Sequence, residues 1–204
     1  MGDNMDKYNS IRNKRLFNSL IFIIILFFII GIFVTIFLSK QDNNIIKDSL
    51  NNFLINIKDN KIDNFYIKNT IISYIICNTI IFILTLSIIG IVVNIISLAY
   101  KSFSLSFTIF NIIKIYKLKS IFLISYVIPD IFNLFISLVY SYYLIKFSKK
   151  LIDKLFRKKD YNIKSLLKKN LKLYIICLIM FIINTILKLY VVPNMIKPFI
   201  NKIM

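Results

Sequence analysis

Residues 16–39 read LFNSLIFIIILFFIIGIFVTIFLS and contain no charged side chain. An α-helix rises ~1.5 Å per residue, so this segment is ~36 Å long, enough to cross a hydrocarbon core of ~30 Å. Arg12, Lys14 and Arg15 precede it, as basic residues precede the apolar core of a secretory signal peptide. However, the apolar stretch exceeds the usual ~7–15 residues of a signal peptide, and no small-residue cleavage motif follows it. We therefore predict a retained membrane span.

The composition of the whole chain agrees with this interpretation. Hydrophobic residues make up 58% of the 204 residues and the mean hydropathy is +0.74, whereas soluble domains average ~45–50% apolar residues. The net charge of +18 would also suit nucleic-acid binding. The basic residues, however, gather in blocks that flank apolar segments, which is the pattern that membrane insertion produces. We therefore expect this chain to contact a lipid bilayer and not nucleic acid.

The other apolar segments predict an all-α fold, a polytopic transmembrane helical bundle in a single domain. We predict about five spans, over residues 16–39, 70–98, 100–117, 120–147 and 172–192. Segment 102–113 is the difficult part, because alone it is only ~18 Å long as a helix. Either the 70–100 segment ends early and its tail joins 102–113, or residues 114–128 fold partly back into the bilayer.

The charged connections predict the topology. Positively charged loops stay in the cytoplasm, so the basic N-terminus and the lysine-rich loop 146–172 are both placed inside. Between these two cytoplasmic points the chain must cross the membrane an even number of times, which is satisfied by the first four predicted spans. Loop 40–69 follows the first span and the C-terminus follows the fifth span, so both are placed outside. The predicted location is the cell membrane, with several crossings.

The outer loop contains a predicted amphipathic helix. Its apolar residues recur at the spacing of one helical face, and Asp42 lies where an N-cap is expected. We take Leu50, Phe53, Leu54 and Ile57 as candidate partner-docking residues. The alternative is that this face only anchors the helix at the membrane interface.

Three polar residues in the middle of the chain have two interpretations each. Lys101 is either an intramembrane cation that pairs with or binds another group, or a helix-end lysine whose amine reaches the cytoplasmic interface. The second interpretation of Lys101 is favoured. Ser102 and Ser106 either allow two helices to approach closely or bond to their own helix backbone.

Pro129 and Asp130 interrupt the apolar segment 120–147. Asp130 is either a carboxylate that marks an ion pathway or part of the first turn of a new helix opened by Pro129, where its charge complements the helix dipole. The helix-start interpretation is favoured. A pair between Lys101 and Asp130 is left open.

Residues suited to catalysis or metal binding are scarce. The chain has no His and no Glu, and all nine acidic residues are Asp. A zinc site or a Ser-His-Asp arrangement is therefore excluded or very hard to build. We predict that the chain is not an enzyme and that it has no catalytic residue, no cofactor and no metal site.

The order of these features resembles the stage II sporulation protein M family of endospore-forming bacteria. The resemblance covers nearly the whole chain: the basic N-terminal anchor, the stretches KDSLNNFLINIK and SIIGIVVNIISLAYKSFSLSFTIFNII, the motif VIPDIF, the basic linker and the ending LKLYVVPNMIKPF. The family has a Lys-Gly-x-x-x-Gly-Phe-like signature, whose positions here are Lys101, Ser102, Ser106 and Phe107. Serine therefore stands where glycine is usual. Pro129 matches the proline that opens the next membrane helix in the family.

The resemblance implies a non-catalytic membrane scaffold of the engulfment machinery, located at the septal or engulfing membrane during sporulation. Its implied partners are two peptidoglycan-degrading proteins, stage II sporulation proteins D and P. The alternative is a subunit of a membrane transporter or permease, suggested by the broken middle region and by Lys101 and Asp130. No small-molecule substrate is evident in the sequence.

Overall fold

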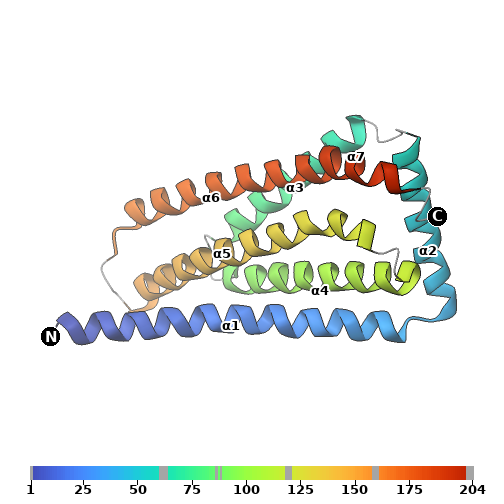
Figure 1. Ribbon diagram of the computed structural model, residues 1–204. Coiled ribbons are helices and arrows are strands. Elements are labelled where there is room, and N and C mark those ends of the chain that lie inside the picture. The colour runs from blue at the N-terminus through green and yellow to red at the C-terminus, as the bar shows by residue number, and fades with distance from the viewer. Residues whose placement is uncertain are drawn as a thin grey trace.

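The structure is entirely helical in the residues that it describes. The computed structural model describes residues 2–59, 64–85, 87, 89–117, 121–157 and 161–200. The elements in chain order are α1 (Gly2–Phe37), α2 (Lys40–Lys58), α3 (Asn64–Leu84), α4 (Gly90–Tyr116), α5 (Ile121–Arg157), α6 (Ile163–Ile186), the π-helical segment η2 (Leu187–Val191), α7 (Val192–Ile196) and the 3-10 turn η3 (Lys197–Phe199). The predicted all-α fold is confirmed (Figure 1).

Within the described residues, four helical stretches are long and apolar enough to cross a membrane. They are Asn13–Phe37, Gly90–Tyr116, Ser125–Phe156 and Ile163–Phe199. The apolar part of α3, Asn69–Leu84, is shorter and measures ~24 Å as a helix. Large apolar side chains cover the sides of the bundle: Phe22 and Phe135, for example, are both 64% exposed. Such a surface suits lipid, and the chain is a multi-pass membrane protein.

In chain order the long helices alternate in direction, so that α1, α4 and α6 run one way and α3 and α5 run the other way (Figure 1). α1 packs against α4, α4 against α5, α5 against α6, and α3 against α6. The start of α1, the end of α5 and the start of α6 lie at one end of the bundle, which we call the basic end (Figure 1). α2 and the C-terminal segment lie at the opposite end, which we call the α2 end (Figure 1).

The break in the middle of the chain lies earlier than the sequence predicts. The predicted spans 70–98 and 100–117 meet near residue 99, whereas α4 is continuous from Gly90 to Tyr116. This is the first of the two arrangements considered for this region, in which the earlier segment ends early and its tail joins 102–113. The sequence pattern misses the border because the whole region is apolar and carries no charge before Lys101.

Local hydrogen bonds and one glycine explain why α3 stops where it does. The hydroxyls of Thr85 and Ser87 donate to the carbonyls of Phe82 and Leu84, at 2.5 and 2.6 Å, and so occupy acceptors at the end of α3. A Cβ atom on Gly90 would lie 2.2 Å from Thr85 Cα. Only glycine therefore lets α4 begin so close to the end of α3.

Pro129 lies inside α5, two turns after its start, and does not open a helix. The favoured helix-start interpretation of Pro129 and Asp130 is therefore wrong. A proline inside a helix removes the backbone hydrogen bond to the carbonyl four residues earlier, here that of Ser125. At the proline itself, Asn184 Nδ2 on α6 donates to the Pro129 carbonyl at 2.9 Å and joins α6 to α5.

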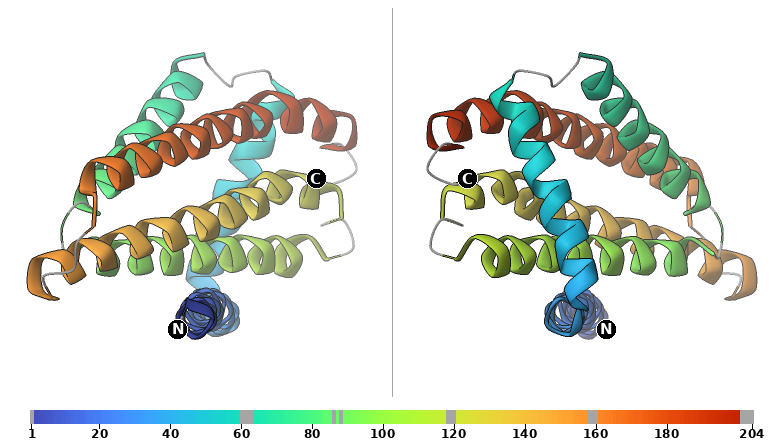
Figure 2. Two further views of the ribbon diagram at one scale, coloured as in Figure 1. Left: turned by 90° about the vertical axis from the view of Figure 1, so that its left-hand side faces the viewer. Right: turned by 90° about the vertical axis from the view of Figure 1, so that its right-hand side faces the viewer.

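α2 runs across one end of the bundle, crosswise to the long helices, and lies in front of them in the right-hand view of Figure 2. Ser39 is its N-cap and accepts a hydrogen bond from the Asp42 amide at 3.1 Å. Leu54 and Ile57 are buried, at 2% and 3% exposure, in an apolar cluster with residues of α4, α5 and α7. The amphipathic helix thus packs on the rest of its own chain.

This packing overturns one prediction. The sequence assigns Leu50, Phe53, Leu54 and Ile57 to partner docking, but all four pack against that apolar cluster. The Phe53 ring lies 4.9 Å from the Tyr126 ring, centroid to centroid. An apolar face predicts burial but not the identity of the surface that covers it, and here the chain itself covers the face.

Candidate functional site

A cavity of about 580 Å³ lies between α3, α4, α5 and η2. Many of the residues that line it carry polar groups, although it lies among apolar helices. The polar residues that matter here are Tyr74, Asn78, Lys101, Asp130, Asn133 and Lys188. Ionisable side chains inside a membrane bundle cost free energy and usually serve a binding or transport role, so this cavity is the candidate functional site.

Two of the charged groups in the cavity neutralise each other. Lys188 Nζ donates to Asp130 Oδ2 at 2.6 Å, and the two side chains are 23% and 22% exposed. The Lys188 ammonium also lies 4.6 Å from the centroid of the Tyr126 ring, where the ring face attracts a cation. The ion pair links the end of the last long helical stretch to α5.

The backbone around Lys188 is unusual. Residues 187–191 form a π-helical turn, in which the Val192 amide donates to the Leu187 carbonyl. Pro193 follows directly and has no amide hydrogen to donate, so the ordinary hydrogen-bond pattern cannot continue. π-helical turns insert an extra residue and are frequent at functional sites. This turn is the segment that carries Lys188 toward α5.

A buried amide pair lies next to the ion pair. Asn184 Nδ2 donates to the Pro129 carbonyl and also to Asn133 Oδ1, at 2.9 and 3.0 Å. Asn133 and Asn184 are 6% and 7% exposed. These bonds hold α6 against α5 beside Asp130 and so fix the position of the ion pair.

Lys101 lies in the middle of α4, three turns after Gly90, and not at a helix end. The favoured interpretation of this residue as a helix-end lysine is therefore wrong, because α4 begins earlier than expected. Its Nζ donates to Ser137 Oγ at 2.8 Å and lies 4.7 Å from the centroid of the Phe181 ring. In the described part of the chain these partners are neutral, and Asp130 pairs with Lys188 instead of Lys101.

The two lysines occupy different levels of the cavity. Ser137, which contacts Lys101, follows Asp130 by two turns of α5. Two turns of an α-helix correspond to about 10 Å. The cavity therefore contains a neutral ion pair nearer the α2 end and a cation nearer the middle of the bundle.

Ser102 and Ser106 face away from this cavity and lie between α4 and α1. Both are completely buried. Ser102 Oγ donates to the Ile24 carbonyl of α1 at 2.7 Å, whereas Ser106 Oγ donates to the Phe103 carbonyl of its own helix. A Cβ atom on Gly31 would lie only 1.9 Å from Ser106 Oγ. The two serines thus lie where the helices approach most closely, in agreement with a packing role.

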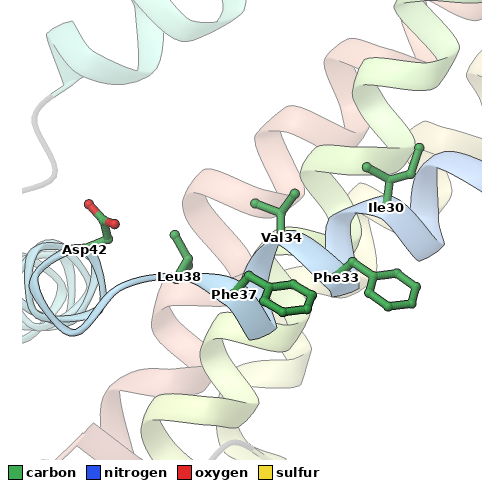
Figure 3. Close-up of a pocket in the computed structure, with 6 residues that line it drawn as sticks. All are labelled: Ile30, Phe33, Val34, Phe37, Leu38 and Asp42. Carbon is green, nitrogen blue, oxygen red and sulfur yellow. The ribbon is translucent and has the colours of Figure 1, made fainter.

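A second hollow lies at the corner between α1 and α2 (Figure 3). Its volume is about 490 Å³, and its lining residues are Ile30, Phe33, Val34, Phe37, Leu38 and Asp42. Figure 3 shows the apolar side chains along α1 and the single carboxylate on α2. Phe33 and Phe37 are 56% and 80% exposed. The hollow is a piece of open apolar surface, and it has fewer polar groups than the central cavity.

Lys188 is a residue of this site that the sequence pattern does not single out. The signal was nevertheless present, since Lys188 and Asp130 each stand alone in an apolar segment. An isolated charge at membrane depth needs a partner of opposite sign, which would have suggested this pair as an alternative to a pair between Lys101 and Asp130.

A comparison of the chain with protein families, with curated proteins and with solved structures found no match. The chemistry of the cavity is therefore inferred from its own residues.

Proposed function

We propose that this chain is a non-catalytic membrane scaffold that holds partner proteins through the outward face of α2. One observation carries the proposal: α2 lies across the end of the bundle with its apolar face buried, so its opposite face is held rigidly beyond the ends of the long helices (Figure 2). A helix fixed in this way can bind a partner without paying the entropy of ordering itself.

The outward face of α2 replaces the docking residues that the sequence suggests. Ile45, Asp48, Asn52 and Ile55 recur at the spacing of one helical face, and all are exposed. Ile45 and Ile55 are 58% and 42% exposed, although they lie on the polar side of the helix. Two isoleucines between polar neighbours suit the apolar centre of a small protein interface.

The charge distribution supports an outside location for this face. The predicted loop 146–172 is largely helical, because α5 continues to Arg157 and α6 begins at Ile163. The basic residues before residue 16, in the last turns of α5 and in the first turns of α6 belong to the end of the bundle opposite α2 (Figure 1). Positive loops stay in the cytoplasm, which favours a cytoplasmic N-terminus, five crossings including the short α3, and an extracytoplasmic α2 and C-terminus.

The resemblance to the stage II sporulation protein M family gives the proposal its specific form. The scaffold would act in engulfment at the septal membrane, and stage II sporulation proteins D and P would be the partners that α2 recruits. These partners would degrade peptidoglycan, so the scaffold itself would need no catalytic group.

A pull-down of the full-length chain from detergent-solubilised sporulating cells tests this proposal. The double variant Ile45→Asp/Ile55→Asp should insert into the membrane normally but lose most of its co-purified cell-wall hydrolase. The matched control Ile45→Val/Ile55→Val keeps the apolar surface and should retain the hydrolase. Equal recovery from both variants would contradict docking on this face, and no hydrolase with the wild-type chain would contradict the scaffold itself.

A transporter or permease subunit is the second candidate function. The observation that favours it is the polar cavity with Lys101, Asp130 and Lys188 inside the apolar bundle. The same pull-down separates the two candidates, because a transporter subunit should bring down an ATPase or another membrane subunit. In that case, substitutions on the outward face of α2 should leave the complex intact.

A further inference from the structure

The central cavity has one positive charge more than its own residues balance. Asp130 and Lys188 form an ion pair, whereas Lys101 contacts the neutral Ser137 hydroxyl and the Phe181 ring and forms no salt bridge with an acidic side chain among the described residues. A cation in apolar surroundings is costly unless a counter-charge is near. A monovalent anion in the cavity would supply this counter-charge, whereas a dianion would leave an excess of negative charge beside Asp130.

Other polar groups line the cavity around Lys101 and around the ion pair. Ser97, Lys101 and Ser104 follow the spacing of one face of α4, and all three line the cavity. Tyr74 and Asn78, one turn apart on α3, line the opposite wall. The Lys101 ammonium and the hydroxyls of Ser97 and Ser104 can donate hydrogen bonds to the oxygens of a carboxylate at the level of Lys101.

The cavity opens sideways, between α3 and α4. Among its lining residues, Cys77 on α3 is exposed and Tyr100 on α4 is 69% exposed. Ile81, Leu105 and Leu134 contribute apolar side chains to the lining. An organic group attached to the carboxylate would therefore meet an apolar wall and an exit toward the side of the bundle.

We propose that the cavity binds a monocarboxylate anion, with the carboxylate at Lys101 and the organic group between α3 and α4. The anion is either a small carboxylate from solution or an amphiphile from the lipid, such as a fatty acid. The site goes beyond the docking role of α2 and does not depend on it, since α2 residues do not line the cavity.

Cys77 provides a reporter inside the site. In a Cys177→Ala background, the rate at which N-ethylmaleimide modifies Cys77 is measured on the full-length protein in phosphatidylcholine nanodiscs, with butyrate or with palmitate. Bound carboxylate should slow the modification in a saturable manner. Butanol and hexadecanol, which have no charge, should not slow it.

Variants of Lys101 test the role of its charge. Lys101→Met should weaken the apparent affinity on the order of tenfold to a hundredfold, the usual effect of losing a hydrogen bond to a charged group. Lys101→Arg should retain binding. Lys149→Met, at an exposed position of α5, is the matched control and should behave as wild type.

The outcomes separate the two sources of the anion. Protection by palmitate alone supports an amphiphile from the lipid, and protection by butyrate supports a carboxylate from solution. Absence of protection by either compound overturns the proposal. Equal protection in Lys101→Met and wild type, or equal protection by the uncharged alcohols, also overturns it. Lys101→Arg shows whether a loss in Lys101→Met reflects the charge or a general disturbance of the fold.

Discussion

Lys188 and Asp130 are 58 residues apart in the sequence, yet Nζ and Oδ2 lie 2.6 Å apart. The pair joins the π-helical turn η2 to α5 beside the Asn133–Asn184 hydrogen bond. Two irregular features of the chain, a proline within α5 and a π-helical turn before Pro193, thus meet at one polar contact.

Removing one member of the pair should destabilise the bundle. Asp130→Asn removes the carboxylate that pairs with Lys188, and we expect a loss of about 1–3 kcal/mol. Replacing both residues, as Asp130→Asn/Lys188→Met, should recover much of this loss, because no uncompensated charge stays behind. Thermal denaturation of the purified protein in detergent measures both effects. If the double variant is as unstable as the single variant, the loss of stability does not come from the uncompensated charge of Lys188.

Adjacent residues of α2 should differ sharply in their contribution to stability. Leu54→Ala removes a side chain that is 2% exposed in the cluster of α2, α4, α5 and α7, and it should cost about 2–4 kcal/mol. Ile55→Ala removes a side chain that is 42% exposed and should cost less than about 1 kcal/mol. Limited proteolysis within α2 measures the difference, since loosening of α2 exposes its backbone. Equal protease sensitivity of the two variants would contradict the packed position of α2.

Gly31 should tolerate no side chain. The Cβ of Gly31→Ala would lie 1.9 Å from Ser106 Oγ and 2.8 Å from the Phe103 carbonyl, so α1 and α4 must move apart. We expect a loss of about 1–3 kcal/mol, typical of overpacking. Adding Ser106→Gly removes the closer of the two clashes and should restore part of the stability. Phe33→Ala, on the exposed side of α1, is the control and should have a small effect.

The proposed topology predicts which positions an impermeant maleimide reaches in intact cells. In a Cys77→Ala/Cys177→Ala background, Asn52→Cys on α2 should react without permeabilisation. Ser87→Cys and Ser165→Cys, both at exposed positions, should react only after permeabilisation. Ser87 is the decisive position, because it follows α3. Reaction of Ser87→Cys in intact cells would show that α3 does not cross the membrane.

The sequence predicts the fold class well because apolar helices of membrane length are visible in composition alone. It places the borders of the middle helices less well. Between Thr70 and Tyr100 the chain carries no charge, and the end of α3 depends on two hydroxyl contacts and on the close approach of Gly90 to Thr85. Such contacts depend on three-dimensional geometry and leave no periodic signal.

The sequence identifies some residues of the candidate site but not how they pair, again because the pairing depends on three-dimensional geometry. Lys101, Pro129 and Asp130 are conspicuous as polar residues or breakers in apolar segments, and all three take part in the centre of the bundle. Their partners lie on other helices, so the pairing of Asp130 with Lys188 depends on which helices are neighbours. The burial of Leu54 likewise depends on a cover supplied from the other end of the chain.

The burial of α2 against the C-terminal residues has a consequence for folding during synthesis. Leu54 and Ile57 are buried against Val192, Ile196 and Ile200, which are synthesised well over a hundred residues later at about 5–20 residues per second. During that interval of several seconds the apolar face of α2 is not yet covered by the C-terminal residues. A nascent chain that stalls before residue 190 would keep this face exposed and would be open to attack by quality-control proteases.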